Sequence, residues 1–187
     1  MIMCTFKKIC VTNRHLIDRS LYEQLKIVFT ISKPNFLILR EKDLSEAEYR
    51  ELAYKVKLLC DMHSVRLIVN KYYGVARELG IPVQLSSPYY ESNVGELYGL
   101  SVWVSVHSIN EAIRINNSDV DAIIAGHIYD TECKKGLPGR GIDFLTSIVE
   151  QVDVPVYAIG GIDEFNIEEV ASAGASGACQ MSFYMKL

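Results

Sequence analysis

Short apolar runs alternate with amphipathic segments along the whole chain, at intervals of roughly two dozen residues, as strand–helix units would give. The apolar runs are rich in Val, Ile and Leu and do not alternate with polar positions, which is typical of parallel strands buried on both faces. This pattern predicts eight strands, at residues 9–12, 36–40, 66–70, 83–85, 102–106, 122–126, 156–159 and 178–181.

The segments between these strands carry signals for helix starts. Ser45 followed by Glu48 predicts a capping box, in which each side chain accepts a hydrogen bond from the backbone of the other residue, and a helix that runs to about Asp61. Ser108 followed by Glu111 repeats the pattern before residues 112–115. The first of these helices is expected to bury a face that consists of Leu52, Val56 and Leu59.

A third helix is expected to begin near Phe165, with Asp163 as its cap, and to end at Gly174.

Strand–helix units without a linker or a break in composition favour a single-domain (β/α)₈ TIM barrel over residues 1–187. An open doubly wound sheet is the alternative, and the even spacing of the strands makes it the weaker one. Few residues follow the last predicted strand, so the last helix should be truncated or missing.

The charge balance and the cysteines narrow the function classes. The formal net charge of −4 argues against a general affinity for nucleic acid. No apolar run approaches the roughly 20 residues that span a bilayer, and residues 1–8 lack the pattern of a signal peptide. The five cysteines are widely spaced and form no Cys-x-x-Cys pair, so we expect no disulfide framework, no zinc site and a cytoplasmic location.

In a TIM barrel the functional residues lie at the carboxyl ends of the strands. Cations and hydrogen-bond donors predominate at these positions, which predicts an anionic ligand. The residues are Arg40, Lys42, Asn70, Lys71, Gln84, Ser86, Ser87, Ser105, His107, His127, Gly160, Gly161, Gln180, Met181 and Ser182.

Two histidines are candidates for acid/base chemistry. His127 ends the buried run 122–126 and opens a loop that contains Lys134 and several glycines, which suits a side chain that transfers protons near neutral pH. The alternative is a core histidine bonded to backbone carbonyls. His107 directly precedes the Ser108–Glu111 pair, and its alternative role is to orient that turn.

Glycines and cations supply the candidate anion contacts. Gly160 and Gly161 allow the backbone to approach a phosphate, and the amides of Met181 and Ser182 can add to the same site; the alternative is a tight turn. Arg40 ends a buried strand and needs a partner for its charge. The alternative for Arg40, Glu41 and Lys42 together is a solvated charge cluster. A nucleophilic Cys133 beside Lys134 is a further alternative that no established Cys–His pair supports.

The chain resembles the thiamine phosphate synthase superfamily over nearly its whole length. The segments Leu-Arg-Glu-Lys (39–42), Ser-Val-His-Ser (105–108) and Ala-Ile-Gly-Gly-Ile (158–162) are shared by both branches of that superfamily. The segment 126–141 is similar to the TenI-type thiazole tautomerases, because synthases usually have proline in place of His127 and threonine in place of Cys133. Synthases also hold magnesium with aspartates after the third and fourth strands, where this chain has Asn70-Lys71 and residues 84–88, Gln-Leu-Ser-Ser-Pro.

The resemblance implies an isomerase of thiamine biosynthesis that aromatises a carboxylated thiazole phosphate tautomer without a metal or a cofactor. It implies proton transfer by His127, and phosphate binding by the backbone of Gly161, Met181 and Ser182. For the carboxylate end or the shape of the pocket it offers Arg40, Asn70 and Lys134. Cys133 matches the motif without a nucleophilic role, and Lys42, His107, Gly160 and Gln180 complete the expected site.

Two other functions are consistent with the same resemblance. A magnesium-dependent thiamine phosphate synthase is indicated by Arg40 and Lys42, which face a pyrophosphate in that branch. A non-catalytic regulatory protein that binds thiazole phosphate is the third possibility, without direct DNA contact because no basic stripe or helix-turn-helix is evident. Relatives in the superfamily imply a homo-oligomer, and neither a membrane nor a nucleic acid is expected as a partner.

Overall fold

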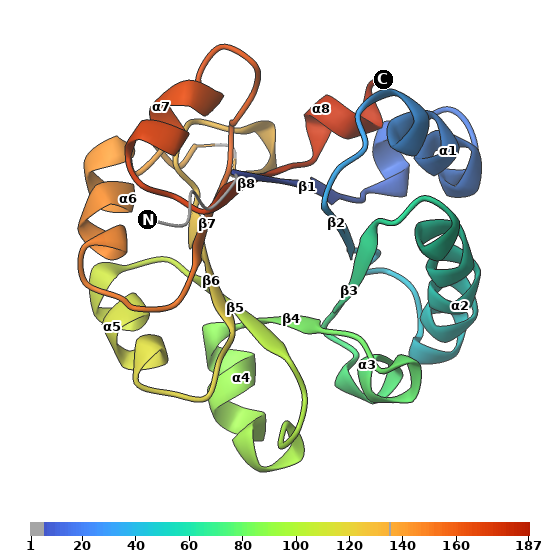
Figure 1. Cartoon of the computed structure of the whole chain (residues 1–187), viewed down its shortest axis with the longest axis horizontal. Coiled ribbons are helices and arrows are strands. Elements are labelled where there is room, and N and C mark those ends of the chain that lie inside the picture. The colour runs from blue at the N-terminus through green and yellow to red at the C-terminus, as the bar shows by residue number, and fades with distance from the viewer. Residues whose placement is uncertain (1–5, 135) are drawn as a thin grey trace.

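The computed structural model describes residues 6–134 and 136–187, except the side chain of Cys133. Parallel strands follow one another around a closed barrel in sequence order, with helices on the outside (Figure 1). The strands are β1 (Lys7–Val11), β2 (Phe36–Leu39), β3 (Arg66–Asn70), β4 (Val83–Ser86), β5 (Val102–Val106), β6 (Ala122–Gly126), β7 (Val156–Ile159) and β8 (Gly177–Gln180). The predicted (β/α)₈ barrel is confirmed, and the doubly wound sheet is not formed. The expectations for residues 1–5, including Cys4, lie outside the described residues.

Strands β3, β5, β6 and β7 begin and end at the predicted residues. β1 differs most, because it begins at Lys7 and ends before Thr12. Lys7 pairs with Gly177 where β1 and β8 close the barrel. The strand start at Lys7 was missed because its charged side chain does not fit the apolar pattern used to predict strands. Thr12 leaves the strand and its hydroxyl accepts a hydrogen bond from the Arg40 amide at 2.9 Å, so Arg40 too lies just beyond its strand.

The helices occupy the connections between strands. They are α1 (Leu21–Ile31), α2 (Glu46–Met62), α3 (Tyr73–Leu79), α4 (Ser87–Asn93), α5 (Ile109–Asn116), α6 (Ile142–Val149), α7 (Ile167–Ser172) and α8 (Ser182–Met185), with short 3₁₀ turns η1 (Arg14–Leu16), η2 (Val94–Glu96) and η3 (Glu132–Lys134). Both bonds of the predicted capping box at Ser45 and Glu48 form at the start of α2. Ser20 and Glu23 form another box at α1, which the sequence analysis missed.

Two of the expected helix starts differ from the structure. At α5, Ser108 caps the Glu111 amide, but the Glu111 carboxylate accepts from the amide of His107 at 2.5 Å, so only half of the box forms. At α7, Asp163 is not the cap: the helix begins at Ile167, after Asn166. The Asp163 carboxylate instead accepts from the Phe165 amide at 2.9 Å, which closes a turn before the helix.

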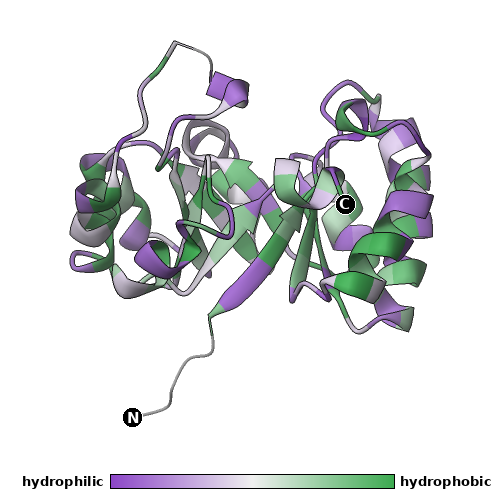
Figure 2. Cartoon of the chain, turned by 90° about the horizontal axis from the view of Figure 1, so that it is seen from above, coloured by the Kyte–Doolittle hydropathy of each residue, from purple (hydrophilic) through white to green (hydrophobic). Residues whose placement is uncertain are grey.

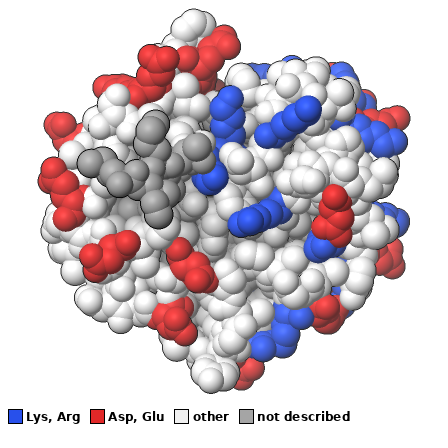
Figure 3. Space-filling view, viewed as in Figure 1, with Lys and Arg blue, Asp and Glu red and all other residues white. Residues whose placement is uncertain are grey.

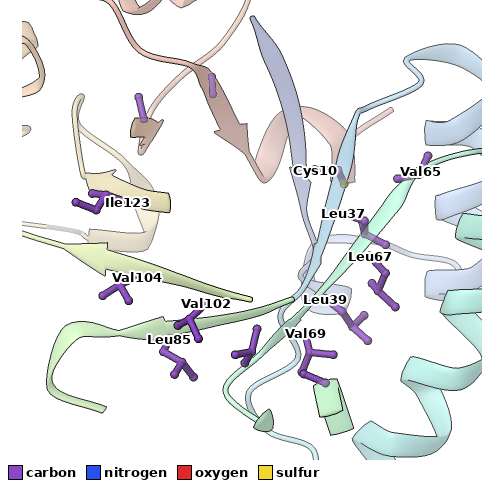
Figure 4. Packing of buried hydrophobic residues seen from close by; sticks show 14 of the residues in the cluster. Cys10, Leu37, Leu39, Val65, Leu67, Val69, Leu85, Val102, Val104 and Ile123 are labelled. Carbon is purple, nitrogen blue, oxygen red and sulfur yellow. The ribbon is translucent and has the colours of Figure 1, made fainter. Parts of the chain in front are cut away.

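Apolar side chains fill two layers. The outer layer lies between strands and helices, and Figure 4 shows Leu37, Leu39, Leu67 and Val69 pointing from β2 and β3 toward the surrounding helices. Leu59 of α2 is buried in this layer as predicted, together with Val56, while Leu52 is half-buried against its edge. Figure 2 shows the result in the hydropathy of the chain, with apolar residues on the strands and on the helix faces turned toward them.

The inner layer fills the barrel itself. Near the strand starts it contains Phe36, Trp103 and Tyr157, with the Trp103 and Tyr157 rings stacked at 4.6 Å between centroids and Phe36 5.1 Å from Trp103. The guanidinium of Arg66 lies 5.8 Å from the centre of the Phe36 ring. Figure 3 shows this end of the barrel, where Lys and Arg side chains lie near the middle of the face and most acidic ones lie toward its rim. The aromatic rings therefore close the barrel opposite the predicted site.

Among the cysteines whose side chains are described, Cys10, Cys60 and Cys179 are free and buried. Burial raises the pKa of the Cys60 thiol to about 12, and it raises the pKa values of Cys10 and Cys179 as well. These thiols are therefore protonated at neutral pH and serve as packing groups.

The last helix, α8, is a stub of four residues, as expected from the short C-terminus. Its place is fixed by Tyr184 and Met185, which are buried, and by Gln24 of α1. The Gln24 amide donates to the carbonyl of Tyr184 at 2.8 Å and to that of Leu187 at 3.3 Å. A buried side chain thus ties the end of the chain to the first helix.

We expect Gln24→Met to lower the free energy of unfolding by about 1 to 3 kcal/mol, because it leaves the buried Tyr184 carbonyl without this donor. Equilibrium urea denaturation measures the change. Gln151→Met is the matched control, since the exposed Gln151 amide donates to the Ser147 carbonyl at 2.8 Å where water can replace it. Equal losses in the two variants would show that burial of the Gln24 contact adds nothing.

Candidate functional site

A cavity of about 520 Å³ opens at the carboxyl ends of the strands. It brings together the predicted site residues whose side chains are described, and Cys133 lies outside that description. The predicted residues in its lining are Arg40, Lys42, Asn70, His107, His127, Lys134, Gly160, Gly161, Gln180, Met181 and Ser182. Of the other strand-end residues, Ser87 is buried outside this lining, whereas Lys71, Gln84, Ser86 and Ser105 belong to it.

Positive charge is concentrated on one side of the cavity. The pKa of the Lys42 ammonium is lowered, chiefly by the charge of Arg40, then by partial burial and by Lys134, so these three cations lie close together. Lys71 adds a fourth cation, with its ammonium 5.0 Å from the centre of the Tyr72 ring. The described residues of the lining include neither aspartate nor glutamate. Cations without a carboxylate partner in the cavity favour an anionic ligand.

Glu41 does not belong to a solvated charge cluster. The residue is 2% exposed, and its side chain is turned away from the cavity toward Arg14. The Arg14 guanidinium lies 3.0 Å from the carboxylate, and the Arg14 backbone amide also donates to it. Arg14 pairs in addition with Asp43. This network fixes the chain after β2 against the chain after β1, and it places Arg40 and Lys42 on either side of a buried anchor.

His127 is 8% exposed and belongs to the cavity wall. Its Nε2 lies 3.3 Å from the carbonyl oxygen of Leu137, which is in the loop between β6 and α6. That loop folds back onto the strand end, because the Arg140 amide donates to the His127 carbonyl at 3.0 Å. A carbonyl oxygen only accepts hydrogen bonds, so Nε2 carries the proton and Nδ1 is the basic nitrogen of neutral His127.

His107 lies on the neighbouring strand end and is more exposed than His127. Its Nδ1 is 2.8 Å from the carbonyl oxygen of Gly126. By the same argument Nδ1 of His107 carries a proton that it donates to this carbonyl, and Nε2 is the ring nitrogen not used in this bond. The two imidazoles therefore present opposite nitrogens.

Gly160 and Gly161 have a packing reason for being glycine. Both have positive φ, at 105° and 65°. A Cβ on Gly160 would stand 2.3 Å from the Cβ of His127, and one on Gly161 would stand 2.5 Å from the carbonyl oxygen of Asp130. The turn after β7 is thus pressed against the chain after β6, and this contact explains the glycines whether or not a phosphate binds there.

Polar side chains form a hydrogen-bonded row across the strand ends of β3, β4 and β5. Asn70 Nδ2 donates to Gln84 Oε1 at 2.5 Å, and Gln84 Nε2 donates to Ser105 Oγ at 2.8 Å. The Gln180 side chain is also held by a hydrogen bond, because its amide donates to the Ile162 carbonyl at 3.3 Å. These bonds hold neutral amides in fixed orientations along the wall.

Sequence reasoning missed the aromatic part of the wall. Tyr89, in the first turns of α4, and Phe183 of α8 both line the cavity. Burial raises the pKa of the Tyr89 hydroxyl, and its ring lies 6.4 Å from that of Tyr73. The available signal was Pro88, which marks the start of a helix directly after β4.

Residues suited to a metal ion are not gathered in this part of the molecule. Among the described residues, no three or more His, Cys, Asp or Glu side chains are placed to hold one. None of the helices in residues 6–134 and 136–187 is both long and apolar enough to cross a membrane.

Comparison with known proteins gives one consistent result. A family model described as thiamine monophosphate synthase matches residues 9–183. Thiamine-phosphate synthase of Clostridium botulinum is 31% identical over 149 residues, which cover 77% of this chain and 73% of that protein. The protein of the same name from Clostridium acetobutylicum is 29% identical over 184 residues, covering 95% and 86%. Among solved structures, thiamine phosphate pyrophosphorylase from Pyrococcus furiosus is similar with a TM-score of 0.80 at 25% identity, covering 95% of this chain and 86% of that chain.

Proposed function

Because the chain belongs to the thiamine monophosphate synthase family, in which TenI proteins are included, we propose that it is a thiazole tautomerase. The observation that carries this proposal is the composition of the cavity, which combines two histidines with four cations and has no carboxylate among its lining residues. Such a cavity suits proton transfer on a substrate with two anionic ends.

The proposed substrate is a carboxylated thiazole phosphate tautomer with an exocyclic alkylidene carbon. We assign its phosphate to the backbone of Gly161, Met181 and Ser182, where the glycine turn and the start of α8 meet the cavity. Its carboxylate is assigned to Arg40 and Lys134, which line the same cavity. Holding both ends fixes the ring between them, and positioning of this kind lowers the barrier to a proton transfer.

The reaction removes the proton from the ring carbon that bears the carboxylate and adds one to the alkylidene carbon. The ring becomes aromatic, and no electrons are gained or lost overall. We assign the removal to Nδ1 of His127, because its Nε2 is held by the Leu137 carbonyl. The low exposure of His127 keeps competing water away from the basic nitrogen.

The magnesium ion that synthases of this family use does not fit the residues present here. The resemblance places its ligands after the third and fourth strands. In this chain the cavity wall there consists of Asn70, Lys71, Gln84, Leu85, Ser86 and Tyr89. An ammonium repels a divalent cation, and a side-chain amide that is hydrogen-bonded to a neighbouring residue is a poor substitute for a carboxylate ligand. We therefore derive no step through a metal ion.

Purified protein treated with a chelator should convert the thiazole phosphate tautomer to its aromatic form, with a change in ultraviolet absorbance as the ring forms. Turnover without added metal supports the proposal. Tight binding of the aromatic product with no turnover would contradict it and would favour the non-catalytic binding protein.

The second candidate is thiamine phosphate synthase, which the names of the relatives from both Clostridium species favour. Arg40 and Lys42 remain available to an anionic leaving group in that reaction. It predicts release of pyrophosphate from the pyrimidine and thiazole precursors that depends on magnesium. Measuring this release beside the tautomer assay, on the same preparation, separates the two activities.

A further inference from the structure

The two cavity histidines differ in the nitrogen that is free to react. His127 donates from Nε2 to the Leu137 carbonyl at 3.3 Å, and His107 donates from Nδ1 to the Gly126 carbonyl at 2.8 Å. Neutral His127 is therefore a base at Nδ1. When His107 is protonated, it is an acid at Nε2, because its Nδ1 proton stays with the Gly126 carbonyl.

The two side chains start from the ends of neighbouring strands. β5 and β6 pair in parallel with Val106 opposite Ala125, so His107 and Gly126 are the next residues along the two strands. The Gly126 carbonyl that holds His107 belongs to the peptide bond that leads into His127. Both residues line the same cavity. The backbone positions of the two histidines are thus fixed by the barrel strands.

Aromatisation involves two carbons, one that loses a proton and one that gains a proton. If a single base does both, it must reach both carbons in turn. On the basis of the tautomerase function above, we propose that His107 is a second catalytic residue, the general acid that protonates the alkylidene carbon after His127 has deprotonated the ring carbon.

The step balances without a further reactant. The ring C–H bond breaks and its proton goes to Nδ1 of His127, while the electron pair enters the ring. The alkylidene π pair forms a new C–H bond with the proton from Nε2 of His107. The enzyme is left with protonated His127 and neutral His107. Exposed His107 regains its proton from solvent, and His127 loses its own after the product leaves.

His107→Asn separates this role from a structural one. The asparagine amide stands where Nδ1 stood and can still donate to the Gly126 carbonyl, but nothing replaces Nε2. We expect this variant to melt at the wild-type temperature and to lose about 10²- to 10⁴-fold in kcat. In D₂O it should still exchange the ring hydrogen of unconverted substrate for deuterium, which mass spectrometry detects, because His127 is intact. His107→Ala, which loses both functions, completes the set.

Turnover by His107→Asn within about threefold of wild type, with His107→Ala impaired, would show that His107 only orients the Gly126 carbonyl. Loss of both turnover and exchange in a folded His107→Asn protein would also overturn the proposal, since the base would then depend on His107. If the wild-type protein forms no aromatic product, the tautomerase assignment fails first and the role of His107 fails with it.

Discussion

Replacing His127 by glutamine is expected to lower kcat for aromatisation by about 10²- to 10⁴-fold, the range typical of a lost general base. The glutamine amide can keep a hydrogen bond to the Leu137 carbonyl, which holds the loop between β6 and α6 in place. It has no group at the position of Nδ1, so the proton of the ring carbon has no acceptor. Steady-state kinetics should show the loss in kcat with little change in KM, because the anionic ends bind elsewhere.

His63→Gln is the control for this substitution. His63 is exposed at the end of α2 and packs against Phe29, away from the cavity, so its replacement should leave kcat unchanged. A folded His127→Gln protein that turns over substrate as fast as wild type would remove His127 from the mechanism.

Gly160→Ala should destabilise the protein by about 2 to 4 kcal/mol and reduce activity strongly. The new Cβ would meet the Cβ and Cα of His127 at 2.3 and 2.8 Å, and the residue would also have to keep a φ of 105°. Neither neighbour is the end of a flexible side chain. The strand end that carries His127 must therefore move.

Gly99→Ala isolates the backbone part of that effect. Gly99 has a φ of 76°, and a Cβ there would meet nothing within 4 Å. We expect a loss of about 1 kcal/mol for this control, from the backbone conformation alone. Chemical denaturation of both variants gives the comparison, and similar losses would mean that the contact with His127 relaxes at little cost.

The parts of the candidate site that are placed by the strands could be predicted from the sequence. Runs such as 122–126 are apolar because both faces of a barrel strand are buried, and parallel pairing brings their carboxyl ends together. Arg40, His107 and His127 could therefore be assigned to one cavity before any contact was known. The capping signals were equally local, and Ser20 with Glu23 shows that one of them was present but overlooked.

Contacts between distant segments could not be predicted in this way. The ion pair of Arg14 with buried Glu41 joins two loops 27 residues apart in the chain, and a charged triplet in the sequence does not reveal which member is buried. The carbonyl partner of His107 belongs to Gly126, at the end of β6, and that of His127 belongs to Leu137, whose position depends on how the loop after β6 folds back. Which ring nitrogen of each histidine is bonded to a carbonyl therefore became known only from the folded structure.

The ring stack inside the barrel provides an internal optical probe. Trp103 is the sole tryptophan of the 187-residue chain, is 5% exposed and lies against Tyr157 near the strand starts. Indole emission depends on the immediate surroundings of the ring, so the native signal reports the closed barrel. Neither Trp103 nor Tyr157 is among the residues that line the cavity. Fluorescence can thus follow unfolding of every variant on one common scale, separately from events at the opposite end of the barrel, where the cavity lies.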